Sequence, residues 1–354
     1  MLRILVIRLS SIGDIVHALP AVAALGQSFP EAEIAWAVES RFAELVEQNP
    51  FVRRAIRLDT LGWQRRWKSP ATSREVVRSL AEVRRFRPNC ALDFQGLMKS
   101  AALARLSGAG RRVGFGGPWL RERWAAGFYT EQARAPGRTH VVEENLALVE
   151  ELGVPPVPRE RWQFPLPSSH AAEAQITQRL AALEVRRFLI VNPGGGWISK
   201  RWAPERYAEL VGEFGRDEDY AVLVTGSPSE EPMIGSILKL AQAPRAHYFP
   251  STLVEFIALV RRASLLVGGD TGPLHLAAAV GTPIVAIYGP TNPARNGPFS
   301  PQDIALWSPS SAGQRLPRTH WRLRQRRVTT HLQGVTVEAV REAIRRRLAH
   351  AHGV

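Results

Sequence analysis

Short apolar runs recur along the chain, and most of them end in glycine-containing turns. Runs of this kind occupy residues 3–9, 33–38, 90–94, 188–191 and 265–267. They are long enough for strands that are buried on both faces, and most of them are followed by a segment whose residues are typical of a helix. Strands that alternate with helices predict parallel sheets covered by helices, so we expect an α/β fold.

The stretch 265–298 shows this pattern most completely, as a strand, a glycine turn, a helix, a second strand and a Pro/Gly/Asn-rich loop. Asp270 and Thr271 are residue types that cap a helix, and Gly272 follows them. Free N–H groups here would lie just beyond a strand's carboxyl end, where open α/β sheets bind phosphorylated ligands. An ordinary strand–helix–strand unit would show the same turn. His275 on the turn and the loop at the far side favour a ligand site.

Two further turns follow strands. The turn at 10–14 contains Gly13 and ends at Asp14, which either caps the next helix or faces a ligand. The turn at 192–196 contains three glycines, which alone would serve any tight turn. Lys200 follows closely enough to reach back to a diphosphate held by this turn.

The length of 354 residues predicts two domains, joined by the proline-rich segment 154–169. Cys90 is the only cysteine, which excludes an intramolecular disulfide and a cysteine-based metal site and fits a reducing, cytoplasmic setting. Charged residues interrupt the N-terminus, which therefore does not resemble a signal peptide. No apolar run approaches the roughly 20 residues of a membrane-spanning helix.

The net charge of +14 indicates an anionic partner, either nucleic acid, an anionic membrane surface or a polyanionic substrate, unless it reflects only a solvated arginine-rich surface. The segment 61–68, LGWQRRWK, is either an anion-binding patch with aromatic walls or one amphipathic turn with Trp63 and Trp67 packed inward. Both interpretations can hold together. The densely basic segment 314–327 predicts a loop against anionic lipid, with disorder as the alternative.

Three longer motifs resemble one known family. GGDTGPLHLAAAVGTPIVAIYGPTNPARNGPF is similar to the signature of the bacterial ADP-heptose:lipopolysaccharide heptosyltransferases, and RLSSIGDIVHALPA and DFQGLMKSAAL resemble heptosyltransferase I in particular. The resemblance runs from about residue 1 to 300 and resumes near 333. It implies the GT-B architecture, in which two Rossmann-like domains face a cleft. We expect an acceptor domain at 1–165 and a donor domain at 166–334, with a terminal amphipathic helix at 335–354 that packs back on the first domain.

The resemblance implies an inverting, metal-independent glycosyltransferase without a cofactor, placed peripherally on the cytoplasmic face of the inner membrane. It would move L-glycero-D-manno-heptose from ADP-heptose to the Kdo of Kdo-lipid A. Asp14 would accept the proton of the attacking hydroxyl, and Lys200 would stabilise the departing ADP. The implied donor-binding residues are Gly195, Gly196, Lys200, Glu230, Asp270, Thr271, Gly272 and His275. The implied acceptor-binding residues are Ser11, Gly13, Arg65, Arg66, Lys68, Gln95, Lys99 and Arg121.

Several alternatives stay open. Glu231 could replace Glu230 as the ribose contact, and the pair Asp217 and Asp219 fits a solvated turn better than a metal site. The family often carries Ser or Thr where this chain has Gly195 and its neighbour, so backbone N–H groups would have to contact the diphosphate here. Heptosyltransferase II, a nucleotide-sugar hydrolase or epimerase, and a non-enzymatic protein that binds anionic surfaces are the rival functions. Basic residues beside glycine turns, rather than in one stripe, argue against nucleic acid.

Overall fold

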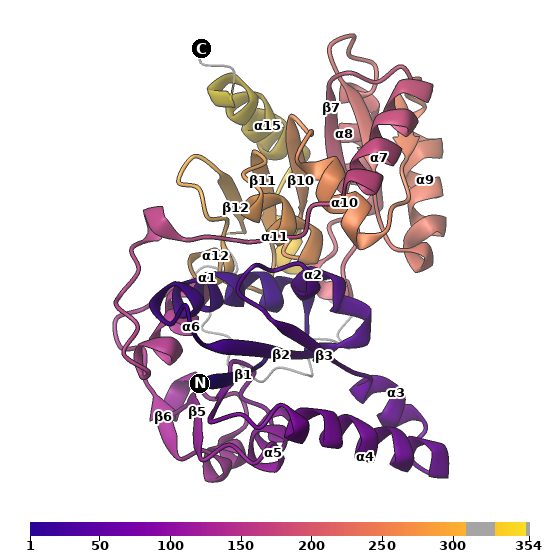
Figure 1. Ribbon diagram of the computed structural model, residues 1–354. Helices are drawn as coiled ribbons and strands as arrows, with labels where there is room; N and C mark the ends of the chain where they lie inside the picture. The colour runs from indigo at the N-terminus through magenta and orange to yellow at the C-terminus, as the bar shows by residue number, and fades with distance from the viewer. Residues whose placement is uncertain (309–329, 352–354) are drawn as a thin grey trace. The chain divides into compact units, whose positions relative to one another are not determined.

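The computed structural model describes residues 1–308 and 330–351, and the chain divides into two compact units, Met1–Pro167 and Ser168–Val354 (Figure 1). The boundary falls in the proline-rich segment, close to the predicted boundary after residue 165. The basic segment 314–327 lies outside the described residues.

The first unit is a six-stranded sheet in the order β3-β2-β1-β4-β5-β6, and neighbouring strands run parallel. The strands are β1 (Arg3–Ile7), β2 (Glu33–Glu39), β3 (Arg54–Leu58), β4 (Cys90–Asp93), β5 (Arg111–Phe115) and β6 (Glu131–Ala133). The helices are α1 (Ile12–Ser28), α2 (Glu44–Glu47), α3 (Thr60–Arg65), α4 (Pro70–Arg85), α5 (Met98–Leu106) and α6 (Val141–Glu150). Short 3-10 helices are η1 (Ser40–Phe42), η2 (Gly117–Trp119), η3 (Arg123–Phe128) and η4 (Arg159–Arg161). In Figure 1, α1 and α6 cover one face of the sheet and α4 and α5 the other.

The second unit repeats this topology, with a parallel sheet in the order β12-β11-β10-β7-β8-β9. The strands are β7 (Phe188–Asn192), β8 (Ala221–Val224), β9 (Ala246–Tyr248), β10 (Leu265–Gly269), β11 (Ile284–Tyr288) and β12 (Ile304–Trp307). The longer helices are α7 (His170–Ala182), α8 (Pro204–Phe214), α9 (Glu231–Ala241), α10 (Leu253–Val260), α11 (Gly272–Ala279) and α15 (Val337–Ala351). Shorter ones are η5 (Ile198–Lys200), η6 (Pro228–Glu230), α12 (Pro293–Asn296) and α14 (Thr330–Gln333).

Both sheets follow the doubly wound Rossmann order, so the predicted α/β class with two Rossmann-like domains is confirmed. Every residue of β7 and β10 is buried, as expected for parallel strands with helices on both faces. The strand order reverses between β1 and β4 in the first unit and between β7 and β10 in the second. Ligands of such folds bind beyond the carboxyl ends of the strands at these switch points, which are where the predicted site turns occur.

The terminal helix does not pack where we predicted. The helix expected at 335–354 appears as α15, which contacts α8, β10, β11 and β12 of the second unit rather than the first. Its buried stripe, Val340, Ile344 and Leu348, joins the hydrophobic core of that unit. The amphipathic pattern was correct, but a stripe of apolar residues does not specify which sheet it covers. Among the described residues, no helix is long and apolar enough to cross a bilayer.

A buried ion pair attaches α15 to the edge of its sheet. Arg347 lies 3.1 Å from Asp303, just before β12, and both side chains are almost fully buried. The same Asp303 oxygen accepts the N–H of Ile284 at 3.0 Å. Loss of one partner from a buried pair leaves an uncompensated charge in the core.

We therefore predict that Arg347→Met lowers the free energy of unfolding of the second unit by about 3 kcal/mol, because it isolates the buried Asp303 carboxylate. Arg345→Met is the matched control. It removes a more exposed pair with Glu213 and should cost less than about 1 kcal/mol. Urea unfolding followed by circular dichroism measures both, and equal losses would contradict the prediction.

Candidate functional site

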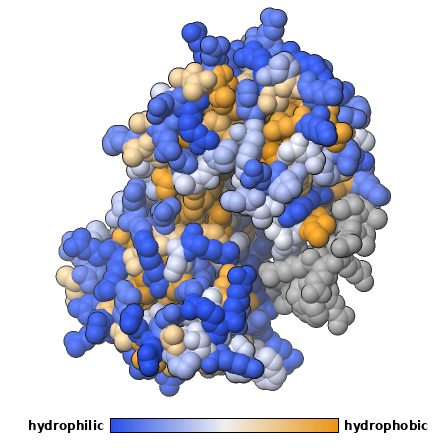
Figure 2. All heavy atoms as spheres, turned by 90° about the vertical axis from the view of Figure 1, so that its right-hand side faces the viewer, coloured by the Kyte–Doolittle hydropathy of each residue, from blue (hydrophilic) through white to orange (hydrophobic). Residues whose placement is uncertain are grey.

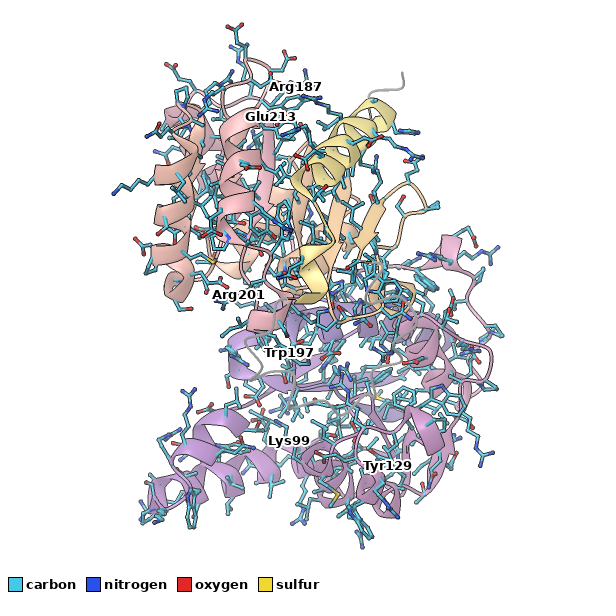
Figure 3. All side chains as sticks on the ribbon, turned by 180° about the vertical axis from the view of Figure 1, so that it is seen from behind. Lys99, Tyr129, Arg187, Trp197, Arg201 and Glu213 are labelled. Carbon is cyan, nitrogen blue, oxygen red and sulfur yellow. The ribbon has the colours of Figure 1, made fainter. Side chains whose placement is uncertain are left out.

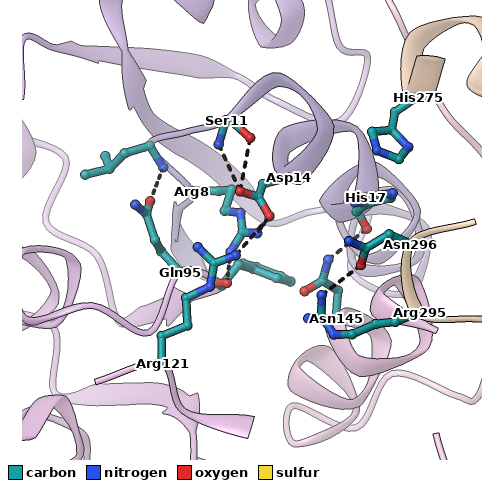
Figure 4. A network of polar contacts seen from close by, with 12 residues as sticks. Arg8, Ser11, Asp14, His17, Gln95, Arg121, Asn145, His275, Arg295 and Asn296 are labelled. Atoms are coloured by element: carbon teal, nitrogen blue, oxygen red, sulfur yellow. Dashed lines mark hydrogen bonds and ion pairs between the residues drawn. The ribbon is translucent and has the colours of Figure 1, made fainter. Parts of the chain in front are cut away.

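The first cluster of predicted residues lies where β1 ends and α1 begins. Asp14 is in the first turn of α1, and its Oδ2 accepts hydrogen bonds from the Ser11 backbone N–H (3.0 Å) and hydroxyl (3.2 Å). Its Oδ1 lies 2.5 Å from the Arg8 guanidinium and 3.2 Å from that of Arg121 (Figure 4). The N-cap of α1 is Ser11, not Asp14 as one interpretation predicted; Asp14 completes the capping box from the third helical position and also pairs with two cations. Gly13 precedes it in the same turn.

Arg8 approaches Asp14 from the end of β1, and its side chain is only 3% exposed. A second guanidinium nitrogen of Arg8 donates to the backbone oxygen of Phe94, just after β4. The N–H of the next residue, Leu9, donates to Oε1 of Gln95 at 2.7 Å. Gln95, which we predicted as an acceptor contact, thus connects the β4 turn to the turn that contains Asp14. Sequence reasoning missed Arg8, although a lone arginine at the end of an apolar strand was a visible signal.

Arg121 reaches Asp14 from a loop that is tied to the same β4 turn. The N–H of Glu122 donates to the backbone oxygen of Gly96 at 3.0 Å, and the N–H of Met98 donates to the Glu122 carboxylate at 2.6 Å. Gly96 has a φ of 67°, a left-handed conformation that favours glycine. These contacts place Arg121 beside Asp14, across 107 residues of sequence.

The electrostatic balance strongly favours an ionised Asp14. Burial raises the pKa of Asp14, but the charges of Arg8 and Arg121 and the Ser11 N–H lower it, and the net pKa lies well below the usual range. The carboxylate is 21% exposed, so one oxygen can still meet a ligand. Its basicity depends on how strongly the two cations hold it. A ligand that drew Arg121 away would make Asp14 a better proton acceptor.

Asp93, which the sequence analysis did not single out, organises the turn behind this cluster. It ends β4 fully buried, and its carboxylate accepts from the N–H groups of Gln95 (2.8 Å) and Gly96 (3.2 Å). It also accepts from the hydroxyls of Ser100 (2.8 Å) and Tyr129 (2.7 Å). Burial raises the pKa of Asp93 more than these hydrogen bonds lower it. The signal for this residue was an aspartate at a strand end before a glycine turn.

The other predicted acceptor residues are less closely tied to Asp14. Lys99 donates to the Thr60 hydroxyl at 3.0 Å, and burial lowers its pKa. Arg66 pairs with Asp59 (3.1 Å) and Glu75 (3.2 Å). Arg65 and Lys68 are exposed, and within the described ranges no hydrogen bond or ion pair joins them to the Asp14 cluster.

The two tryptophans of the segment 61–68 behave differently. Trp63 packs against the core of the first unit, as the amphipathic interpretation predicted. Trp67 is 69% exposed, so its predicted inward packing is wrong. It lies after the last residue of α3, where the helical spacing of four residues no longer places it on the buried face.

The second cluster lies at the switch point of the second unit, where β10 ends. Asp270 is buried; its Oδ2 lies 2.6 Å from the Lys200 ammonium and its Oδ1 2.9 Å from Nε2 of His275. Burial raises the pKa of Asp270, but Lys200 and His275 lower it well below the usual range. An ionised carboxylate only accepts hydrogen bonds, so Nε2 of His275 is the donor. Asp270 thus orients both predicted donor-side groups.

Glu230 joins two turns of this unit. Its carboxylate accepts the N–H of Gly195 at 2.9 Å and both the N–H and the hydroxyl of Ser227 at 2.8 Å. Burial raises the pKa of Glu230, but these hydrogen bonds and Arg201 lower it below its ordinary value. A Cβ on Gly194 would lie 2.3 Å from the Glu230 carboxylate, so a larger residue there would displace the Glu230 side chain. Glu230, rather than the exposed Glu231, is therefore the glutamate that contacts the glycine turn.

The start of α11 presents unused polar groups. The hydroxyl of Thr271, the N-cap residue, is buried and has no hydrogen-bond partner in the part of the chain that the structure describes. Gly272 begins α11 and offers one of the helix's free N–H groups. Lys200 lies beside this end and 5.1 Å from the ring centroid of Trp197, and Arg201 donates to the Gly195 carbonyl at 2.7 Å (Figure 3). A helix N-terminus, a lysine and an unpaired hydroxyl together suit a bound phosphate. Gly196, the last glycine of the turn, is exposed.

No group of three or more His, Cys, Asp or Glu side chains with metal-binding geometry occurs among residues 1–308 and 330–351. The Asp217 and Asp219 pair lies in an exposed loop, where the Asp219 N–H donates to the Asp217 carboxylate at 2.8 Å. This local hydrogen bond is typical of an Asx turn.

The comparisons with known proteins agree with this architecture. Residues 76–321 match the family model of glycosyltransferase family 9 (heptosyltransferase). The chain is 28% identical over 321 residues to lipopolysaccharide heptosyltransferase 1 of Pseudomonas aeruginosa, covering 90% of this chain and 87% of that one. It is 29% identical over 311 residues to lipopolysaccharide heptosyltransferase 1 of Salmonella typhimurium, covering 87% and 95%. The solved structure of the Escherichia coli heptosyltransferase WaaC with ADP has the same fold, with a TM-score of 0.76, 24% identity and coverage of 98% and 100%.

The Asp14 cluster leads to a pH-dependent prediction. Because the folded pKa of Asp14 is depressed, its stabilising contribution is present above the unfolded pKa of about 3.9 and is lost as the pH falls. Asp14→Asn removes this contribution. It should lower the free energy of unfolding by about 1–2 kcal/mol at pH 7, after allowance for partial exposure, and by less at pH 3, where the unfolded Asp14 of the unmodified chain is largely protonated. Arg121→Met is the control: its loss should stay constant from pH 7 to 3, because Asp14 is ionised in the folded state throughout this range and the two unfolded chains titrate alike. Urea unfolding from pH 7 to 3 measures both, and a loss for Asp14→Asn that does not shrink toward pH 3 would contradict the prediction.

Proposed function

The chain belongs to glycosyltransferase family 9, the heptosyltransferase family, and we propose that it performs the reaction of heptosyltransferase I in lipopolysaccharide core biosynthesis. In this reaction, L-glycero-D-manno-heptose passes from ADP-heptose to a Kdo sugar of Kdo-lipid A. The names of the curated relatives from Pseudomonas aeruginosa and Salmonella typhimurium support this assignment. The proposed setting is the cytoplasmic face of the inner membrane, where the enzyme acts as a peripheral protein.

The observation that carries the proposal is the carboxylate of Asp14 beside the partly exposed guanidinium of Arg121. A base next to a cation suits a hydroxyl on a sugar that itself bears a carboxylate. Kdo is such a sugar, whereas the heptose acceptor of heptosyltransferase II is neutral. Binding of the Kdo carboxylate to Arg121 would weaken its hold on Asp14 and raise the basicity of Asp14 at the moment of reaction.

The second unit has the groups expected for the donor. Lys200, the start of α11 and the Thr271 hydroxyl would hold the diphosphate of ADP-heptose. Glu230 would meet the ribose, although its carboxylate already accepts hydrogen bonds from Gly195 and Ser227, so nucleotide binding would rearrange part of this network. The positive charge of Lys200 and of the helix N-terminus would stabilise the departing ADP without a metal ion.

The proposed chemistry is one in-line displacement with inversion. The acceptor hydroxyl oxygen forms a bond to the anomeric carbon of the heptose as the bond from that carbon to the phosphate oxygen breaks. The electron pair of the broken bond leaves with ADP, and the hydroxyl proton passes to Asp14. Arg8 holds the Asp14 carboxylate in place during this step, because its side chain is buried and bonded to the β4 turn.

A transfer assay with purified protein tests the assignment. ADP-heptose should be consumed with Kdo-lipid A as acceptor, and not with Kdo-lipid A that already carries one heptose. The reverse preference would favour heptosyltransferase II. ADP-heptose cleavage without transfer would favour a hydrolase, and the absence of any turnover or ADP-heptose binding would favour a non-enzymatic role.

Asp14→Asn should lower the turnover number by about 10²–10⁴-fold and leave ADP affinity nearly unchanged, because it removes the base and preserves the shape of the side chain. Ser11→Ala is the control, since it removes a hydrogen bond to Asp14 and leaves the carboxylate; it should have a much smaller effect. Steady-state kinetics and calorimetry with ADP measure the two quantities. Near-normal turnover of Asp14→Asn would reduce Asp14 to a helix cap.

Lys200→Met should weaken ADP binding by about 10–100-fold, the equivalent of one charge-assisted contact to phosphate. Lys239→Met, which removes an exposed lysine from α9 in the same unit, should leave the dissociation constant unchanged. Calorimetric titration with ADP compares both with the unmodified chain. Unchanged affinity in Lys200→Met would place the nucleotide elsewhere.

A further inference from the structure

Exposed apolar side chains concentrate on one part of the first unit. Single exposed apolar residues are normal on protein surfaces, so only their clustering is informative. Five of the nine large apolar side chains that are exposed in the described parts of the chain fall between residues 67 and 124. They are Trp67, Val77, Met98, Leu106 and Trp124, and we call this set the α4–α5 flank.

The elements that carry the α4–α5 flank are neighbours in space. Helix α4 contacts α5, and α5 contacts η3. Trp67 lies shortly before α4, Val77 on α4 and Trp124 on η3, and their exposed fractions are 69%, 66% and 72%. Figure 2 views the side on which α3 and α4 lie in Figure 1, and most residues on this face of the first unit are hydrophilic.

The same segment of the chain carries most of the net positive charge. From α3 to η3, residues 60–128 contain fourteen Lys and Arg against four Asp and Glu, in a chain whose net charge is +14. Two of these cations lie over the exposed indoles. The Lys68 ammonium is 5.2 Å from the Trp67 ring centroid, and the Arg123 guanidinium is 5.1 Å from that of Trp124. Each of these tryptophans thus exposes an apolar indole ring that has a cation beside it.

We propose that the α4–α5 flank docks on an anionic lipid bilayer, with the indoles in the interfacial region and the cations on lipid phosphates. Tryptophan with adjacent lysine or arginine suits this interface, where apolar contact and attraction to anionic headgroups add together. Nucleic acid would also use cations and aromatic rings, but it would gain nothing from the exposed aliphatic side chains of Val77, Met98 and Leu106. A bilayer buries both kinds of side chain.

The flank also adjoins residues of the proposed acceptor site. Met98 precedes Lys99, Trp67 precedes Lys68, and Trp124 follows Arg121 by three positions. Docking itself is independent of the reaction. The role that we assign to this docking, presentation of a lipid-anchored acceptor to Asp14, rests on the proposed function.

Two single substitutions test the docking without touching the proposed site. Trp124→Glu and Val77→Glu each place a negative charge on the flank at an exposed position. Leu240→Glu is the matched control, because Leu240 is 60% exposed on α9 of the second unit and receives the same charge. Trp67 is left intact because Lys68 beside it belongs to the proposed acceptor site.

Co-sedimentation with phosphatidylglycerol-containing vesicles should show binding that phosphatidylcholine vesicles lack. Trp124→Glu and Val77→Glu should each weaken this binding by about tenfold, and Leu240→Glu by less than twofold. All three variants should keep normal kinetics with a lipid-free Kdo acceptor. Equal losses in all three variants, no binding of the unmodified chain to anionic vesicles, or preferential binding to single-stranded nucleic acid would overturn the proposal. Loss of transfer to the lipid-free acceptor would also overturn it, by assigning these residues to the acceptor site. If no transfer occurs at all, the vesicle data still decide the docking.

Discussion

A carboxylate that is buried at the end of a parallel strand needs hydrogen-bond donors or cations beside it. The turns at the switch points of both units supply them. Asp93 and Asp270 occupy this position, on β4 and after β10. Asp93 is satisfied by neutral donors, two N–H groups and two hydroxyls, which shape the β4 turn. Asp270 is satisfied by Lys200 and His275, which it holds at the start of α11. The first arrangement gives a rigid turn, and the second gives oriented charge.

Asp14 differs from these two because it pairs with two cations of unequal exposure. Arg8 is buried and bonded to Phe94, whereas Arg121 belongs to a surface loop and is one-third exposed. A carboxylate that is paired with two guanidinium groups is a weak base. A carboxylate whose outer cation can transfer to an incoming anion becomes a stronger base only when that anion is present. In the reaction we propose, this contrast would link specificity for an acidic acceptor to the chemistry of proton removal.

The sequence was sufficient for the architecture and for the turns, because apolar runs followed by glycine and helix-capping residues have a strong local signature. It indicated Asp14, Lys200 and Asp270 through their places in those turns. We missed Arg8 as the inner partner of Asp14, although the two residues are only six positions apart. The sequence could not indicate Tyr129 as a donor to Asp93, because that contact joins residues 36 positions apart. It also misplaced α15, since an amphipathic pattern identifies a buried face and not the surface that covers it. It misplaced the indole of Trp67 because that residue lies beyond the end of α3, where the helical spacing no longer applies.

The position of α15 has a consequence for dissecting the protein genetically. Because the terminal helix completes the core of the second unit, each unit is encoded by one uninterrupted stretch of gene. The first unit contains all six strands of its sheet before residue 167. The two units can therefore be exchanged between relatives at a single crossover in the proline-rich segment. Under the proposed function, a chimaera made in this way would carry the acceptor preference of one parent and the nucleotide-sugar preference of the other.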